Sequence, residues 1–194
     1  MEGLYRAFYE NLSLQNAGIL LGLGLILSHG AALWKKDLVR NFLPKFPRHQ
    51  QAGMILLIIC AVWSFLLMLF MDLGEFYNIR KGVLILIPFA TYLVIQYVPE
   101  FLAVRALGIL MLLAASPLLN AAFLKAPVTR LLLPILAYVW IWVGIFLVGM
   151  PYLLRDWINW FLKGGETMWK RACYGGLGYG TLTLICALAF WGGV

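Results

Sequence analysis

Residues 49–71 read HQQAGMILLIICAVWSFLLMLFM, a run of 23 residues without a charged side chain. An α-helix needs roughly 20 apolar residues to cross the ~30 Å hydrocarbon core of a bilayer. Five more uncharged runs of similar length occur, and all charges lie between the runs or in the N-terminal tail. These runs are residues 11–34, 82–99, 106–124, 131–154 and 172–194. The sequence therefore predicts an integral membrane protein with six transmembrane helices.

The composition leaves no room for a soluble domain. The chain has 194 residues, of which 63% are hydrophobic and 12% are charged, whereas a soluble domain carries about 25% charged residues. Continuous apolar runs favour helices over the alternating strands of a β-barrel. We therefore predict an all-α protein with a single membrane domain over 1–194, folded as three hairpins of consecutive spans. The expected spans are approximately 14–34, 51–71, 82–98, 100–119, 131–154 and 173–192.

The net charge of +7 is distributed unevenly between the two expected sides. Ten Lys and Arg residues lie on the side of loops 35–50, 99–105 and 155–171, which we call the basic side, and five lie opposite. Basic loops are retained in the cytoplasm, so this pattern favours membrane topology over nucleic-acid binding. We expect these loops to be cytoplasmic and both termini to be outside, in the plasma (bacterial inner) membrane. The first run is longer than a signal-peptide core, so we expect it to remain uncleaved.

Two segments between spans are predicted to be short amphipathic helices at the membrane interface. Residues 36–43 and 155–163 each place apolar side chains on one helical face and charges on the other. The segments also align, KDLVRNFL with RDWINWFL. This similarity suggests that the first and last hairpins are parallel repeats, and chance similarity is the alternative. Residues 1–15 have the apolar spacing of another interfacial helix.

Glycine and proline positions distinguish the spans from one another. Gly18 and Gly22 in the first span have the spacing that lets a second helix approach closely, and we interpret them as packing sites within the chain. The two middle runs are the shortest, and each contains a proline, Pro88 or Pro117. A proline inside a helix removes a backbone donor and frees a carbonyl oxygen. The middle hairpin is therefore the expected irregular part of the fold.

Polar side chains of the middle hairpin are candidates for ligand or partner contacts. Ionisable groups at membrane depth are expensive and often functional, which draws attention to Glu100 and Arg105. Anchoring in the headgroup region is the alternative, because a separation of five residues does not place them on one helical face. Gln96 could hydrogen-bond either one. Asn120 and His29 complete the set of candidate contacts.

No motif identifies a reaction. The nucleophile elbow of hydrolases, the zinc-protease helix motif and the phosphate-binding loop are all missing from the sequence, so we predict no catalytic or metal-binding residue. The chain has two histidines, His29 and His49, and histidine is a common haem ligand. Both lie near the basic side instead of deep in the spans, so a haem between them is not expected, and no cofactor is predicted.

These features favour a non-catalytic integral membrane subunit of a larger protein complex, with a scaffolding, lipid-binding or partner-stabilising role. The expected partners are membrane lipids and other integral membrane subunits, without nucleic acid. The alternative is a small transporter or a substrate-binding membrane subunit with its site at the proline-broken middle hairpin.

Overall fold

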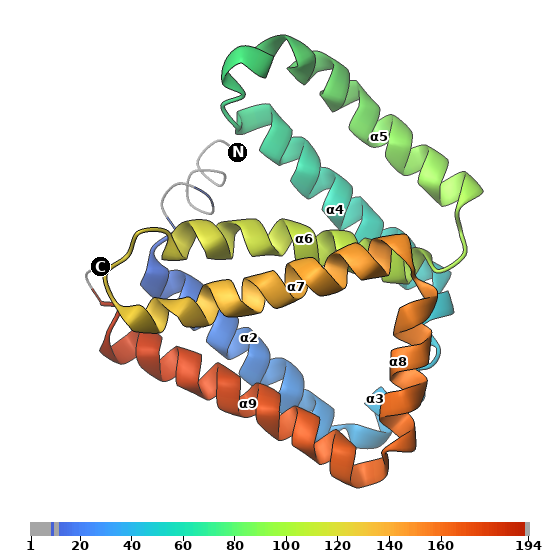
Figure 1. The fold of residues 1–194 in the computed structure, drawn as a ribbon. Coiled ribbons are helices and arrows are strands. Elements are labelled where there is room, and N and C mark those ends of the chain that lie inside the picture. The colour runs from blue at the N-terminus through green and yellow to red at the C-terminus, as the bar shows by residue number, and fades with distance from the viewer. Residues whose placement is uncertain (1–8, 10–11, 193–194) are drawn as a thin grey trace.

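The computed structural model describes Tyr9 and residues 12–192, and this part of the chain is helical and contains no strand (Figure 1). Most of the expected interfacial segment 1–15 lies outside the described residues. The six long helices are α2 (Leu14–Trp34), α4 (Gln50–Phe70), α5 (Arg80–Tyr97), α6 (Leu102–Ala122), α7 (Leu132–Gly149) and α9 (Gly165–Ala189). The shorter elements are α3 (Lys36–Phe42), α8 (Tyr152–Lys163), η2 (Phe46–Arg48), η3 (Gly74–Ile79) and η4 (Val128–Leu131).

The predicted all-α class with six span-length helices is confirmed. Each of the six is long and apolar enough to cross a membrane, and a 21-residue helix is about 30 Å long. The uncharged runs therefore located every long helix.

Two helix boundaries differ from the expected spans. α7 ends at Gly149, because Pro151 has no backbone donor to continue it, and α8 begins at Tyr152. α9 begins at Gly165, about two turns before the expected span. Hydropathy detects the apolar part of a helix, and the charged residues of the first turns of α9 extend the helix beyond that part.

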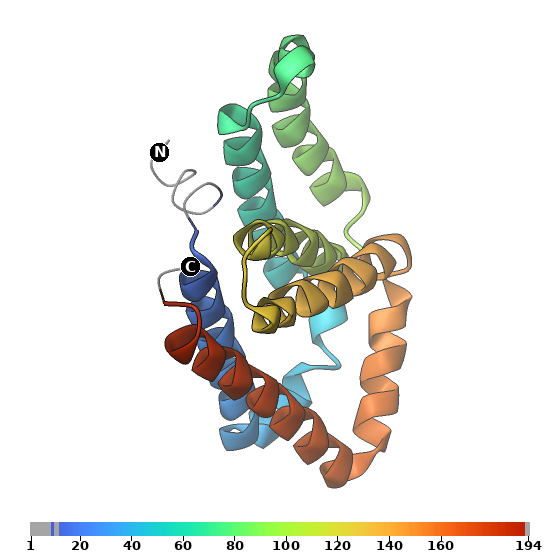
Figure 2. The same ribbon diagram turned by 60° about the vertical axis from the view of Figure 1, so that its left-hand side comes forward.

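The described segments that correspond to residues 36–43 and 155–163 are both helical. α3 has seven residues and α8 has 12. α8 runs across the ends of the long helices instead of alongside them (Figures 1 and 2). A parallel repeat of the flanking spans stays a prediction.

The long helices do not pack in the three consecutive pairs of the expected hairpins. The extensive contacts join α2 to α9, α6 to α7, α4 to α6, and α4 to α5. The expected arrangement of three hairpins is therefore not confirmed. The first and last long helices lie side by side, and α6 and α7 form the middle of the molecule (Figure 1).

Glycines allow close approach at two helix crossings. A Cβ added at Gly22 would lie 2.9 Å from the carbonyl oxygen of Gly180, and the reciprocal distance is 3.0 Å. Between α6 and α7, a Cβ at Gly108 would lie 2.8 Å from the carbonyl oxygen of Gly144. Close backbone approach of this kind is how helices pack where lipid removes the hydrophobic driving force. The interpretation of Gly18 and Gly22 as internal packing sites is confirmed.

α5 is the least enclosed long helix. Its extensive contacts are with α4 and η3, and none of its residues is buried. The α4–α5 pair projects from the rest of the molecule in both views (Figures 1 and 2). Pro88 lies within α5 without ending it. By contrast, Pro117 is buried in α6.

The connections of the basic side gather at one end of the molecule. The α2–α4 connection with α3, the α5–α6 turn and α8 all lie at the right-hand end in Figure 1, and the start of α2 and the end of α9 lie at the other end. The chain therefore alternates direction through its six long helices.

Candidate functional site

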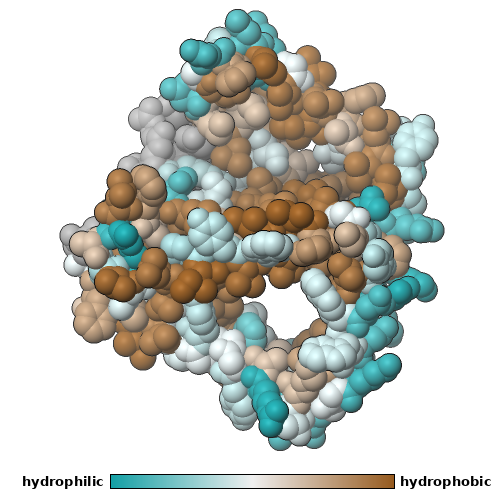
Figure 3. Space-filling view, viewed as in Figure 1, coloured by the Kyte–Doolittle hydropathy of each residue, from teal (hydrophilic) through white to brown (hydrophobic). Residues whose placement is uncertain are grey.

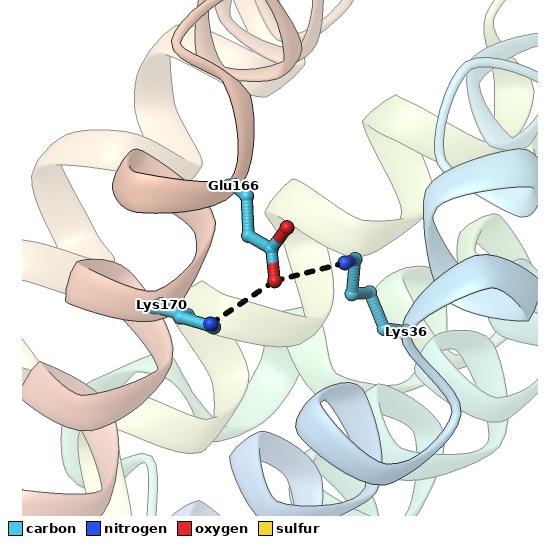
Figure 4. A network of polar contacts seen from close by, with 3 residues as sticks. All are labelled: Lys36, Glu166 and Lys170. Carbon is cyan, nitrogen blue, oxygen red and sulfur yellow. Dashed lines mark ion pairs between the residues drawn. The ribbon is translucent and has the colours of Figure 1, made fainter.

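Charged side chains from α3 and α9 meet at the end of the molecule where the connections of the basic side gather, which we call the basic end. The Glu166 Oε1 atom lies 3.1 Å from Lys36 Nζ and 3.0 Å from Lys170 Nζ (Figure 4). Lys170 is one helical turn after Glu166, whereas Lys36 comes from the start of α3. One carboxylate therefore holds two ammonium groups that are 134 positions apart in the sequence.

An aromatic cluster lies beneath these charges. Trp169 is 3% exposed, and its ring lies 5.7 Å from the Phe161 ring of α8, centroid to centroid. The Arg40 guanidinium of α3 lies 6.0 Å from the centre of the same tryptophan ring. The Trp169 Nε1 atom is buried without a hydrogen-bond partner in the described part of the chain. We call Lys36, Arg40, Glu166, Trp169 and Lys170 the α3–α9 junction.

α8 packs against the junction and is strongly amphipathic. Ile158 is buried, whereas Trp157 and Trp160 are apolar and exposed. Arg155 of the same helix pairs with its neighbour Asp156 at 2.9 Å. Tryptophan favours the boundary between lipid headgroups and hydrocarbon, so α8 has the surface of a helix that lies in that boundary.

The expected contacts of the middle hairpin are only partly brought together. Glu100 lines a pocket of 270 Å³ with Arg48, Gln50 and the α5–α6 turn. Gln96 is exposed, and within Tyr9 and residues 12–192 its side chain has no hydrogen bond to Glu100 or to Arg105. The Glu100 carboxylate makes no ion pair within that part either.

Arg105 and Asn120 lie toward opposite ends of α6. Fifteen residues separate them, which is about 22 Å along a helix. The Arg105 Nε atom is buried without a partner among the described residues, whereas Asn120 is exposed. The middle hairpin thus does not combine all of its candidate residues in one site.

The two histidines have local structural contacts. His29 Nδ1 lies 2.9 Å from the carbonyl oxygen of Leu25, and its ring fills the space above Gly176 of α9. His49 caps α4, with its Nδ1 atom accepting a hydrogen bond from the Ala52 amide at 3.1 Å. His29 therefore contributes to the α2–α9 contact. His49 acts as the N-cap of α4, because it accepts a hydrogen bond from a backbone amide that has no partner within the helix. No group of three metal-ligating side chains occurs among the residues that the structure describes.

An apolar groove of 390 Å³ lies between α2, α4, α6 and α7. Its lining includes Leu21, Trp63, Pro117 and Trp140. The Trp63 Nε1 atom donates a hydrogen bond to the Tyr9 hydroxyl. The surface that lines the groove is therefore almost entirely hydrocarbon. Such a surface can accommodate apolar chains and offers no group for chemistry.

Sequence reasoning missed the α3–α9 junction. Glu166 and Lys170 have the i, i+4 spacing of a helical ion pair, which could have indicated that the last long helix begins before its apolar run. Lys36 had no comparable signal, because its partner is distant in the sequence.

Comparison of the chain with protein-family models, curated proteins and solved structures finds no match. What the fold and the site define is a class: an all-helical protein with six helices that could span a membrane.

Proposed function

We propose that this chain is a non-catalytic integral subunit of a larger membrane protein complex. The single observation that carries the proposal is the exposure of α5, an apolar helix with no buried residue, whose extensive contacts with a long helix are those with α4. Ile85, Phe89 and Tyr92 are exposed and recur at the i, i+4 and i+7 positions of one helical face. A second transmembrane helix packed against this face would enclose α5 as α6 is enclosed within the chain.

A scaffolding role agrees with the distribution of chemistry in the chain. The polar groups of the junction and of the Glu100 pocket lie at the basic end, and the groove among the helices is apolar. The transporter alternative, with its site at the middle hairpin, stays a prediction. No observation favours it, because within the described residues Gln96 makes no hydrogen bond to Glu100 or Arg105 and Glu100 makes no ion pair.

Site-specific photo-crosslinking tests the partner face. A photoreactive residue at Ile85 or Phe89 is expected to give a discrete protein adduct in native membranes, because these side chains face away from α4. The matched control is Leu27 of α2, which is 69% exposed but belongs to a helix already packed on α9. We expect no discrete protein adduct there. A chain that purifies in mild detergent as a monomer, with no adduct from α5, would contradict the proposal.

We also propose that the basic end faces the cytoplasm of the plasma membrane and that both termini lie outside. The support is the charge distribution, since the positive side of a multi-pass protein is retained inside. Membrane lipids and other integral subunits are then the partners.

Cysteine labelling in intact cells tests this orientation. We expect a membrane-impermeant maleimide to label Lys81→Cys in intact cells and Lys45→Cys only after permeabilisation. The native Cys60, Cys173 and Cys186 are buried, so the background should be low. The reverse pattern of labelling would show that the orientation is inverted.

A further inference from the structure

We propose that the α3–α9 junction binds the phosphate of an anionic phospholipid headgroup, an inference that rests on the membrane placement proposed above. The junction carries three cationic side chains, Lys36, Arg40 and Lys170, against the single carboxylate of Glu166. It therefore keeps excess positive charge after its internal pairing, which is complementary to an anionic ligand.

The two lysines are positioned to donate to the same ligand. Both Nζ atoms are held about 3 Å from one oxygen of Glu166, at 3.1 and 3.0 Å. Each ammonium group has three donors and uses one for this carboxylate. The lysine side chains are 32% and 53% exposed, so their remaining donors are accessible. One phosphate group is large enough to bridge two ammonium groups held this close together.

The surroundings favour a lipid over a free anion. Trp34 ends α2 just before Lys36, and Trp160 lies on α8; both are exposed, as expected for side chains at the headgroup boundary. Near the junction, the space-filling view shows an opening between α7, α8 and the α2–α9 pair (Figure 3). α7 and α9 are joined farther along by a hydrogen bond from the Tyr179 hydroxyl to the Leu132 carbonyl oxygen. A headgroup at the junction would therefore have room beside it for hydrocarbon chains.

Trp169 supplies a second, independent indication of a ligand. This side chain is almost completely buried, and its Nε1 donor lacks a partner in the described part of the chain. A buried unpaired donor is costly. The Arg40 guanidinium lies 6.0 Å from the centre of the Trp169 ring, so this buried donor borders one of the cationic groups that we propose to bind the phosphate.

The test measures lipid binding to the purified full chain in a neutral detergent. Dioleoylphosphatidylglycerol is titrated, and thermal unfolding and native mass spectrometry report stabilisation and retained lipid. Dioleoylphosphatidylcholine and inorganic phosphate are the comparison ligands. We expect phosphatidylglycerol alone to stabilise the protein and to stay bound. Lys36→Gln with Lys170→Gln should weaken its binding about 30-fold, since each basic residue near an anionic surface contributes about fivefold.

Glu166→Gln is the matched control, because it breaks both ion pairs but leaves both lysines. It should retain phosphatidylglycerol binding or strengthen it, whereas a purely structural ion pair would make the two variants alike. If the double glutamine variant does not fold, Lys36→Arg with Lys170→Arg keeps the charge and should retain binding. An equal response to phosphatidylcholine, a full response to inorganic phosphate, or unchanged binding after loss of both lysines would overturn the inference. These results are independent of crosslinking from α5, so either proposal can fail alone.

Discussion

Replacing Trp191 by alanine should lower the free energy of unfolding by about 3 kcal/mol, equivalent to roughly 10 °C in the melting temperature. Trp191 is completely buried and follows the end of α9. Its ring lies directly over Gly18 of α2, and its Nε1 atom donates to the Thr129 hydroxyl at 2.8 Å. The substitution would leave a cavity where α2, α9 and η4 meet. Thermal unfolding of the purified protein in a mild detergent measures the effect.

Two variants separate the contributions of the ring and of its hydrogen bond. Trp191→Phe refills most of the cavity without an N–H group, and Thr129→Val keeps the ring but removes the acceptor. We expect Thr129→Val to cost about 1 kcal/mol, well below the loss caused by alanine at position 191. The control is Trp34→Ala, because Trp34 is 86% exposed and its loss should change stability by only about 0.5 kcal/mol. Equal losses from Trp34→Ala and Trp191→Ala would show that burial of the Trp191 ring is not the source of stability.

Alanine substitutions at two nearby glycines of α9 should have different effects on the free energy of unfolding. A Cβ at Gly180 would lie 2.9 Å from Leu25 Cβ and 3.0 Å from the carbonyl oxygen of Gly22. Neither atom is the flexible end of a side chain, so α2 and α9 must separate. We expect Gly180→Ala to destabilise the protein by about 1–3 kcal/mol.

Gly178 supplies the control two residues away in the same helix. No atom lies within 4 Å of a Cβ added at Gly178. Alanine is favoured over glycine within a helix by up to about 1 kcal/mol, so Gly178→Ala should leave stability unchanged or increase it. Unfolding of the two variants in parallel compares the signs directly. A loss of stability in both would mean that the α2–α9 crossing is not where backbone approach matters.

The sequence predicted the long helices better than their arrangement. Uncharged runs located all six because charge is so costly in hydrocarbon. The Gly18–Gly22 spacing predicted that another helix would approach α2. It contained no information that this helix would be α9, since small residues permit many partners equally well.

The same holds for the candidate contacts: the sequence indicates a residue from its local surroundings but does not indicate its partner in the fold. Glu100 was noticed because it is a charge beside a span, and the structure places it next to Arg48 of a different connection. Arg48 could not have been chosen from its own surroundings, which contain several basic residues. The role of Trp191 was equally hidden, because the sequence shows an aromatic residue after a span but not Gly18 opposite it.

Packing of α2 against α9 has a consequence for synthesis of the chain. More than a hundred residues separate the end of α2 from the start of α9. At typical rates of translation, roughly 10–30 s pass before α9 emerges. During that interval the glycine face of α2 lacks its neighbour α9, so the contact between the two helices can form only after the rest of the chain has been made.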